Sequence, residues 1–188
     1  MKILCLLFLS TLISFASNAE TTVDEEFKYY YVSPNSKSEI LSSLNRKSPI
    51  REGSEIYHGY AYSSVKWDFR WKYNRQNCWI TSVNSEVKTT YTLPKLINSG
   101  SDVANIWDKW YPNLLNHEKG HHKLALRIAS NIERKIVNMS SYPTCKELEK
   151  RANDIGYTQV DKLGLLNKKY DKRTKHGESQ GASLFSYL

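Results

Sequence analysis

Residues 113–138 place the strongest constraint on how this 188-residue chain can fold. At the α-helical rotation of about 100° per residue, His117 and His121 share one broad face with a row of apolar side chains. These are Leu124, Ala125, Ile128, Ile132 and Ile136. The opposite face carries Lys119, Lys123, Arg127, Glu133 and Arg134. The pattern predicts a long amphipathic helix with two histidines on its inward side, so the rest of the chain must cover that side.

A second helical pattern comes just before it. Ser101 or Asp102 can cap a helix that continues through Trp110. Pro112 follows, and a proline inside a helix removes a backbone hydrogen bond and kinks the axis. We therefore expect a bend or a restart just before residue 113.

Residues 60–93 alternate in a way that predicts β-structure. Residues 60–73 and 78–93 form two strands joined by a turn at 74–77, and Pro94 should stop the second strand. The expected core face carries Val65, Trp67, Phe69, Trp71, Tyr73, Trp79, Thr81, Val83, Val87, Tyr91 and Leu93. Residues 27–32 form a further strand candidate after a polar lead-in. An alternative use for the segment Thr89–Leu93 is an edge strand that pairs with an extended peptide.

The C-terminal part of the chain has weaker patterns. Residues 145–154 indicate a short charged helix, and residues 157–167 can continue it. A polar tail with several glycines follows.

The N-terminus predicts export. Lys2 precedes an apolar run to Phe15, and Ser17 and Ala19 suit signal peptidase, so residues 1–19 are expected to be a signal peptide. No later segment has the roughly 18 apolar residues of a spanning helix, so we expect no stable membrane insertion after cleavage. The protein would then be periplasmic or secreted. Its formal net charge of +8 fits solubility or attraction to anionic envelope surfaces better than nucleic-acid recognition.

Two cysteines remain after that segment, Cys78 and Cys145. An even pair in an oxidising compartment predicts a disulfide, although two free buried thiols are the alternative.

The segment His117-Glu-Lys-Gly-His121 is an HExxH motif. Residues four apart on a helix lie on one face, so both imidazoles can bind one metal ion. Glu118 lies beside them and can act as a base. This pattern is typical of zinc hydrolases, in which the metal lowers the pKa of a bound water and the carboxylate accepts its proton. Gly120 costs about 1 kcal/mol of helix propensity relative to alanine, so we expect a backbone or a ligand to approach closely there.

A catalytic zinc ion usually has three protein ligands, so a third must come from elsewhere. The candidates are His176, Asp171, Glu147 and His58. The longer motif HExxHxxGxxH is absent, because Arg127 occupies the position of its last histidine. Asp171 could instead orient one of the motif histidines, and Tyr170 could stabilise an oxyanion. His122 borders the polar face, so we expect it to be solvated.

The sequence is similar to the bacterial family known as domain of unknown function 922, whose members are described as secreted zinc-dependent proteases. The matching blocks are Trp71-Lys-Tyr73 followed by Cys78, Tyr91-Thr-Leu-Pro94, the HExxH motif, Cys145, and Tyr170-Asp-Lys-Arg-Thr-Lys-His-Gly177. The resemblance implies His176 as the third zinc ligand.

Two functions from different classes follow. The first is an exported zinc metallopeptidase in which His117, His121 and His176 bind Zn²⁺ and Glu118 is the general base for hydrolysis of a peptide or protein substrate. The second is a non-catalytic envelope protein that uses the same histidines for a structural metal, or for none. A nuclease is a more distant third. The expected fold is α+β, with a small antiparallel sheet packed against the HExxH helix in a single zincin-like domain over residues 20–188, and one disulfide.

Overall fold

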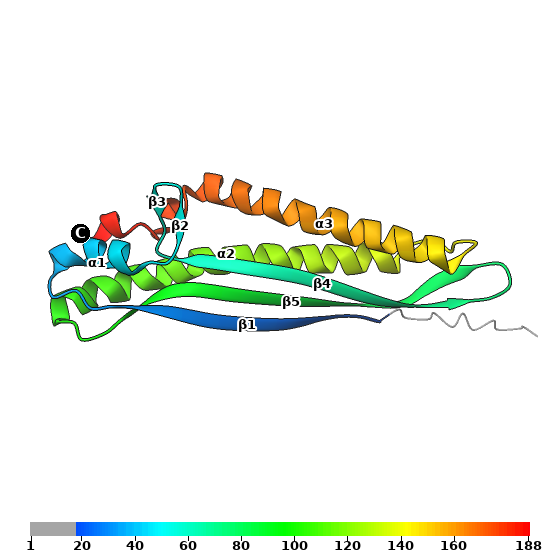
Figure 1. Ribbon diagram of the computed structural model, residues 1–188, viewed down its shortest axis with the longest axis horizontal. Coiled ribbons are helices and arrows are strands. Elements are labelled where there is room, and N and C mark those ends of the chain that lie inside the picture. Colours follow the sequence, from blue (N-terminus) through cyan, green and yellow to red (C-terminus); the bar gives the residue numbers. More distant parts are fainter. Residues whose placement is uncertain (1–17) are drawn as a thin grey trace, which may run out of the picture.

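The computed structural model describes residues 18–188 and has an elongated α+β fold (Figure 1). A three-stranded sheet forms one layer, and the helix α2 (Ser101–Val137) lies along one of its faces. The helix α3 (Cys145–Thr174) packs against α2. Residues 1–17 of the predicted signal segment lie outside the described part of the chain.

The sheet is mixed, with the strand order β1-β5-β4. The strands are β1 (Asn18–Val32), β4 (Tyr60–Tyr73) and β5 (Cys78–Leu96). β4 and β5 form the expected antiparallel hairpin, whereas β1 pairs with β5 in parallel. The prediction of an antiparallel sheet was therefore wrong for β1. A parallel neighbour needs a long crossover connection, which is made here by η1 (Lys37–Glu39), α1 (Ile40–Lys47) and the two short strands β2 (Arg51–Glu52) and β3 (Glu55–Ile56).

Two boundaries differ from the predicted ones. The polar lead-in is part of β1, which pairs with β5 from Asn18 to Val32. Pro94 does not stop β5, which continues to Leu96. The last pair between β4 and β5 is Tyr60 with Thr92, so beyond that point one side of β5 needs no N–H donor.

The core face of β5 changes phase along the strand. Val83, Val87, Tyr91 and Leu93 are buried as predicted, but Cys78 and Ile80 replace Trp79 and Thr81 on the buried side. The cause is a register shift, in which Arg70 pairs with Ser82 and its neighbour Trp71 pairs with Ile80. An extra residue in one strand shifts the alternation of inward and outward side chains by one position, and a strict period-two pattern does not predict that shift.

Both long helices exceed their predicted lengths. α2 runs without a restart through Pro112, which has the buried side chains of Trp110 and Leu114 on either side. α3 is one helix of 30 residues that includes the two predicted helical pieces and the first part of the predicted tail. It begins at Thr144, whose hydroxyl accepts a hydrogen bond from the Glu147 N–H at 3.2 Å. Two short 3₁₀ helices, η2 (Glu178–Gln180) and η3 (Leu184–Tyr187), complete the chain.

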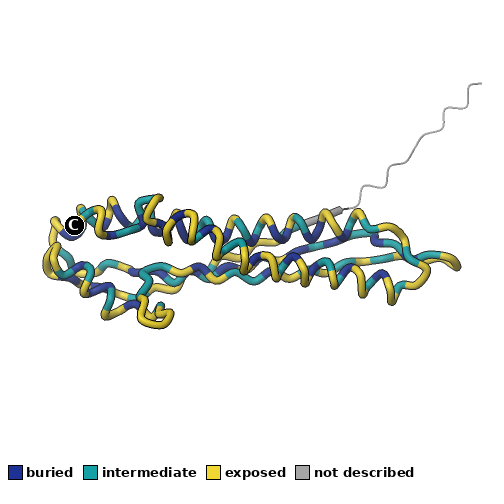
Figure 2. Tube along the Cα trace, turned by 90° about the horizontal axis from the view of Figure 1, so that it is seen from above, coloured by how far each residue is buried: buried dark blue, intermediate teal, exposed yellow. Residues whose placement is uncertain are grey.

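Buried residues follow most of the length of the molecule, and the tip of the β4–β5 hairpin is exposed (Figure 2). They form two apolar clusters. One lies between the second half of α2, α3 and the sheet and includes Val83, Val87, Ile128, Ile132 and Leu148. The other joins the first half of α2 to α1 and the ends of β1 and β5, and includes Leu44, Leu93, Trp107 and Trp110.

The predicted disulfide is present. Cys78 and Cys145 are bonded with their Cα atoms 5.1 Å apart. The backbones of Cys78 and Tyr142 also exchange hydrogen bonds of 2.7 and 2.9 Å. These contacts tie the start of β5 to the loop that precedes α3. No helix within residues 18–188 is both long and apolar enough to cross a membrane.

Candidate metal centre

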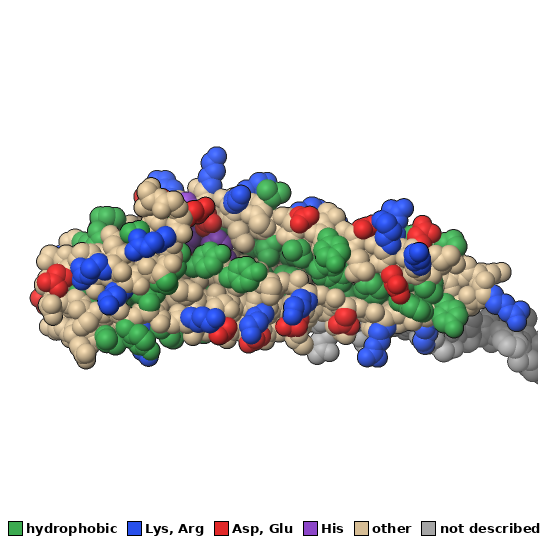
Figure 3. Space-filling model, in the orientation of Figure 1, with side chains coloured by type: hydrophobic (Ala, Val, Ile, Leu, Met, Phe, Trp, Pro, Cys, Tyr) green, Lys and Arg blue, Asp and Glu red, His purple; other side chains and the backbone are tan. Residues whose placement is uncertain are grey.

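The HExxH residues lie on α2 where the two apolar clusters meet. His117, Glu118 and His121 are 4%, 4% and 8% exposed. Both imidazoles face the C-terminal end of α3, as the predicted inward side requires. Histidine side chains are visible between α3 and β4 in the space-filling view (Figure 3).

Asp171, in the last turn of α3, completes a cluster of possible ligands. Its Oδ1 lies 3.0 Å from Nε2 of His121 and 3.5 Å from Nε2 of His117. One ligand atom from each of the three residues lies within 4.8 Å of the other two. Donors bound tetrahedrally at the usual zinc distances are about 3.3 Å from each other. Two imidazole nitrogens and one carboxylate oxygen at this spacing therefore fit a single zinc ion.

The other nitrogen of each imidazole contacts an amide oxygen. His117 Nδ1 lies 2.9 Å from Oε1 of Gln180, and His121 Nδ1 lies 3.1 Å from Oδ1 of Asn167. With Nδ1 as the donor in both neutral rings, each Nε2 would direct a lone pair at a bound metal, whereas a protonated ring donates from Nε2 to Asp171. Sequence analysis missed both amides. Asn167 and Asp171 are one helical turn apart, a signal that would have been visible if α3 had been predicted to extend to Thr174.

Tyr170 joins α3 to the HExxH segment. Its ring stacks on that of His117 at 5.1 Å and meets that of His121 edge-on at 4.9 Å. Its hydroxyl is 3.2 Å from the carbonyl oxygen of His117 and 3.1 Å from Oε1 of Gln180. A Cβ at Gly120 would overlap the Tyr170 hydroxyl. We expected a backbone or a ligand close to Gly120, and the structure has the side chain of Tyr170 there instead.

Glu118 faces the segment that leads into β4. A Cβ at Gly59 would lie 2.7 Å from Oε1 of Glu118, so no larger residue fits there without a shift. Burial raises the pKa of Glu118 to about 6, although the two motif histidines and a hydrogen bond from the Ala61 backbone lower it. A carboxyl group with this pKa is ionised at neutral pH and is still a useful proton acceptor.

The charge of Asp171 is stabilised by the same histidines. Burial opposes its ionisation, but hydrogen bonds from His117 and His121 outweigh burial and hold the pKa of Asp171 well below its usual range. Burial likewise opposes protonation of His121, and its contacts with Asp171 and Asn167 outweigh burial and raise its pKa. Asp171 and His121 therefore each stabilise the charged form of the other.

The other predicted ligands lie outside this cluster. His176 follows the end of α3 with φ of 51°, and its ring lies 5.4 Å from that of Tyr57. His58 hydrogen bonds to Asn45 at 2.8 Å, and Glu147 is in the first turn of α3. Among the described residues, the structure brings Asp171 to the motif histidines and does not bring His176.

Two polar residues of α2 are buried against the sheet instead of being solvated. His122 is 8% exposed, and its Nδ1 lies 2.8 Å from Oγ1 of Thr89. Glu133 is 7% exposed and accepts a hydrogen bond of 2.7 Å from the Thr21 hydroxyl. The prediction of a polar outer face was wrong at these positions, because β1 covers a side of α2 that the sequence pattern leaves open.

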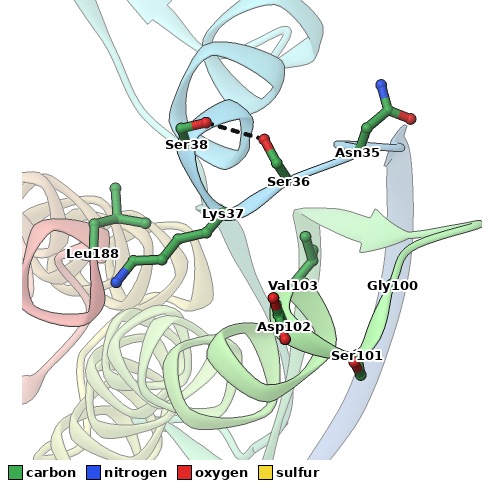
Figure 4. A pocket seen from close by; sticks show the side chains of 9 residues that line it. All are labelled: Asn35, Ser36, Lys37, Ser38, Gly100, Ser101, Asp102, Val103 and Leu188. Atoms are coloured by element: carbon green, nitrogen blue, oxygen red, sulfur yellow. Dashed lines mark hydrogen bonds between the residues drawn. The ribbon is translucent and has the colours of Figure 1, made fainter.

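A pocket of about 580 Å³ lies at the end of the molecule where α2 begins (Figure 4). It is lined by residues 35–38, residues 100–103 and Leu188. The rise of α2 between Ser101 and His117 puts it about 24 Å from the histidines. We assign the chemistry to the histidine cluster, because the residues that line the pocket do not include a comparable set of metal-ligating side chains.

Comparison with known proteins gives one match. The family model described as "Bacterial protein of unknown function (DUF922)" matches residues 27–177. That range contains Cys78, Cys145, the HExxH motif and Asp171, and it ends before Gln180. No curated protein and no solved structure matches the chain. The match covers most of the sequence, so this chain belongs to the DUF922 family of bacterial proteins of unknown function.

Proposed function

We propose that this protein is an exported zinc metallopeptidase, with His117, His121 and Asp171 as the zinc ligands. The observation that carries the proposal is the convergence of these three side chains, within 4.8 Å, beside a buried glutamate. Three protein ligands with an open fourth position are typical of catalytic zinc. The ligand set favours zinc, because imidazole suits it well and carboxylates are among its common ligands. A zincin-like relation between helix, sheet and metal is part of this proposal.

Each side chain has a separate role in the proposed reaction. Zinc, when bound, supplies a water of lowered pKa and polarises a carbonyl oxygen. Glu118 accepts the proton of that water and returns it to the leaving amine. Gln180 and Asn167 fix the imidazole tautomers, and Tyr170 holds the rings against α3. Tyr170 is therefore a positioning residue here, because its hydroxyl already contacts the His117 carbonyl and Gln180.

The test compares the wild type with Glu118→Gln. Zinc content is measured by elemental analysis, and cleavage is measured with a peptide library and with casein. We expect Glu118→Gln to keep stoichiometric zinc and to lose at least about 100-fold in cleavage rate, as for removal of a general base. Equal cleavage by both proteins would refute the mechanism. Absence of cleavage in the wild type, with zinc bound, would favour the structural-metal alternative.

Export is inferred from the apolar N-terminal segment. A disulfide in the described domain is in keeping with an oxidising compartment. Fractionation of cells that express the full chain, with mass analysis of the mature N-terminus, tests both the export and the cleavage after residue 19.

A further inference from the structure

β4 is one of the two outer strands of the sheet, and its first residues lie at the candidate metal centre. The order β1-β5-β4 gives β4 a strand neighbour on one side only. The segment that leads into it contacts Glu118 at Gly59, and the backbone of Ala61 hydrogen bonds to the Glu118 carboxylate. The open edge of the sheet therefore begins at the proposed general base.

A hydrogen bond across the turn between β4 and β5 fixes which peptide groups of β4 face outward. In an antiparallel pair, the N–H and C=O of one residue point to the same side, and the next residue points to the other. Asn74 donates its N–H to the Asn77 carbonyl at 2.9 Å, so even-numbered residues of β4 direct their peptide groups to β5. The odd-numbered residues Ser63, Val65 and Trp67 therefore direct theirs away from β5, and the contact of the Ala61 backbone with Glu118 agrees with this parity.

These outward groups are without partners near the metal centre. In the part of the chain that the structure describes, the only bond from this row to another element is that of Ala61. The helix α3 contacts β4 farther along. There Trp67 donates to Asn153 at 3.2 Å and its ring packs on Gly156, and Trp71 donates to Glu149 at 2.9 Å.

The edge and α3 therefore enclose a recess that opens toward the histidines. In Figure 1, α3 diverges from β4 toward its C-terminal end, and in Figure 3 apolar surface continues from the histidines along the gap between them. From Ala61 to Trp67 the edge is roughly 20 Å long at the usual rise of a strand, enough for about six residues of extended chain.

We propose that an extended polypeptide segment pairs with the β4 edge at Ser63 and Val65 and so extends the sheet by one strand. Backbone hydrogen bonds supply the affinity, and every second side chain of the bound segment points toward the helix layer, so apolar residues are preferred at alternate positions. The segment reaches the histidine cluster at Ala61. This proposal gives the substrate class of the proposed peptidase. It rests on the peptidase function only for the cleavage of the bound segment and not for its binding. The edge is on β4 and not on Thr89–Leu93, because β5 is the central strand.

Binding is tested in the zinc-loaded Glu118→Gln protein by fluorescence anisotropy, which needs no hydrolysis. The probes are labelled, capped nine-residue peptides in which apolar and polar residues alternate. Backbone N-methylation of the tightest binder, one residue at a time, should weaken binding with a period of two, because only alternate peptide groups face β4. Uniform tolerance of N-methylation, or no binding by any peptide of the set, would overturn the proposal.

A matched pair of proline variants tests the protein side. Ser63→Pro removes an outward N–H and keeps the backbone bonds to β5, which an edge strand tolerates. It also removes the contact of the Ser63 hydroxyl with Thr89 on β5 at 2.7 Å, so Ser63→Ala, which loses only that contact, is measured beside it. Tyr73→Pro makes the same change on the same edge, beyond the contact of Trp71 with α3. We expect Ser63→Pro to bind the peptide at least about tenfold more weakly and Tyr73→Pro to bind it as the parent protein does.

Zinc content and thermal unfolding of both variants show whether each is folded. If Ser63→Pro is folded and binds peptide as tightly as Tyr73→Pro, the proposal is wrong. If Ser63→Pro does not fold, the N-methylation pattern decides. If peptides bind tightly and with this period but the wild type hydrolyses none of them, the peptide-binding proposal stands and the proposed peptidase activity is wrong.

Discussion

The ring of Tyr170 lies against the backbone of Gly120, so α3 contacts the HExxH segment where α2 has no side chain. Gly120→Ala gains about 1 kcal/mol of helix propensity, but its Cβ would overlap the Tyr170 hydroxyl. We expect a net loss of thermal stability and of zinc affinity. Gly164→Ala is the matched control in α3, where a Cβ meets nothing within 4 Å. It should raise stability by about 0.5–1 kcal/mol, and a stabilised Gly120→Ala protein would contradict the packing described here.

The identity of the third ligand is tested by two substitutions. Asp171→Asn keeps the shape of the side chain and removes its charge, and we expect zinc affinity to fall by more than about 100-fold, beyond the loss seen for supporting residues. His176→Ala should leave affinity nearly unchanged, because its ring lies against Tyr57. Competition titration with a chromogenic chelator measures both. The reverse order of effects would restore His176 as the ligand and exclude Asp171.

The amide contacts of the imidazoles predict a smaller effect. Gln180→Ala removes the acceptor for His117 Nδ1 and a contact of the Tyr170 hydroxyl. We expect zinc affinity to fall about 10–100-fold, the usual cost of losing a partner that orients a ligand. Asn131→Ala, which removes a half-buried amide on α2 that contacts Arg134, is the control and should bind zinc normally. Equal zinc affinities of the Gln180→Ala and Asn131→Ala proteins would mean that Gln180 does not fix the His117 tautomer.

His58 predicts a pH dependence of stability that is independent of the metal. Burial lowers the pKa of His58 to about 4, against 6.5 for an unperturbed histidine. Between these values the unfolded chain binds a proton that the folded chain does not, so the free energy of unfolding falls as pH drops from 6.5 to 4. The full loss is about 3 kcal/mol at most. His58→Gln cannot take up that proton, so its stability should decline less over this range in urea titrations. Parallel pH profiles for the two proteins would exclude this role of His58.

The disulfide should contribute to stability more than to the site. Cys78 and Cys145 are 67 residues apart, and closing a loop of that length stabilises by about 4 kcal/mol in the chain-entropy model. We expect the Cys78→Ser/Cys145→Ser double variant to unfold at a lower denaturant concentration and to bind zinc with unchanged stoichiometry while folded. Reduction of the wild type should shift the midpoint in the same direction. A variant as stable as the wild type would show that the unfolded chain gains little freedom from losing the bond.

The local pattern of the sequence determined a large part of this protein. Residues four apart on a helix share a face whatever surrounds them, so the pairing of His117 with His121 was predictable. The β4–β5 hairpin followed from its alternation and its turn, and the disulfide followed from counting cysteines outside the predicted signal peptide. Gly120 indicated a close approach, because a glycine in a helix interior needs a reason.

Only the tertiary structure decided what meets these elements. The first residues of β1 are polar and pair with β5 through their backbones, so this part of the strand has no alternating apolar pattern from which it could be predicted. The position of Asp171 beside the motif histidines depends on where α3 ends, since Asp171 is in its last turn and His176 follows it in a left-handed conformation. The amides of Asn167 and Gln180 reach the histidines because α3 packs along α2. Contacts between residues about 50 positions apart in the chain are set by the packing of helices and strands, and such packing has no short-range signature in the sequence.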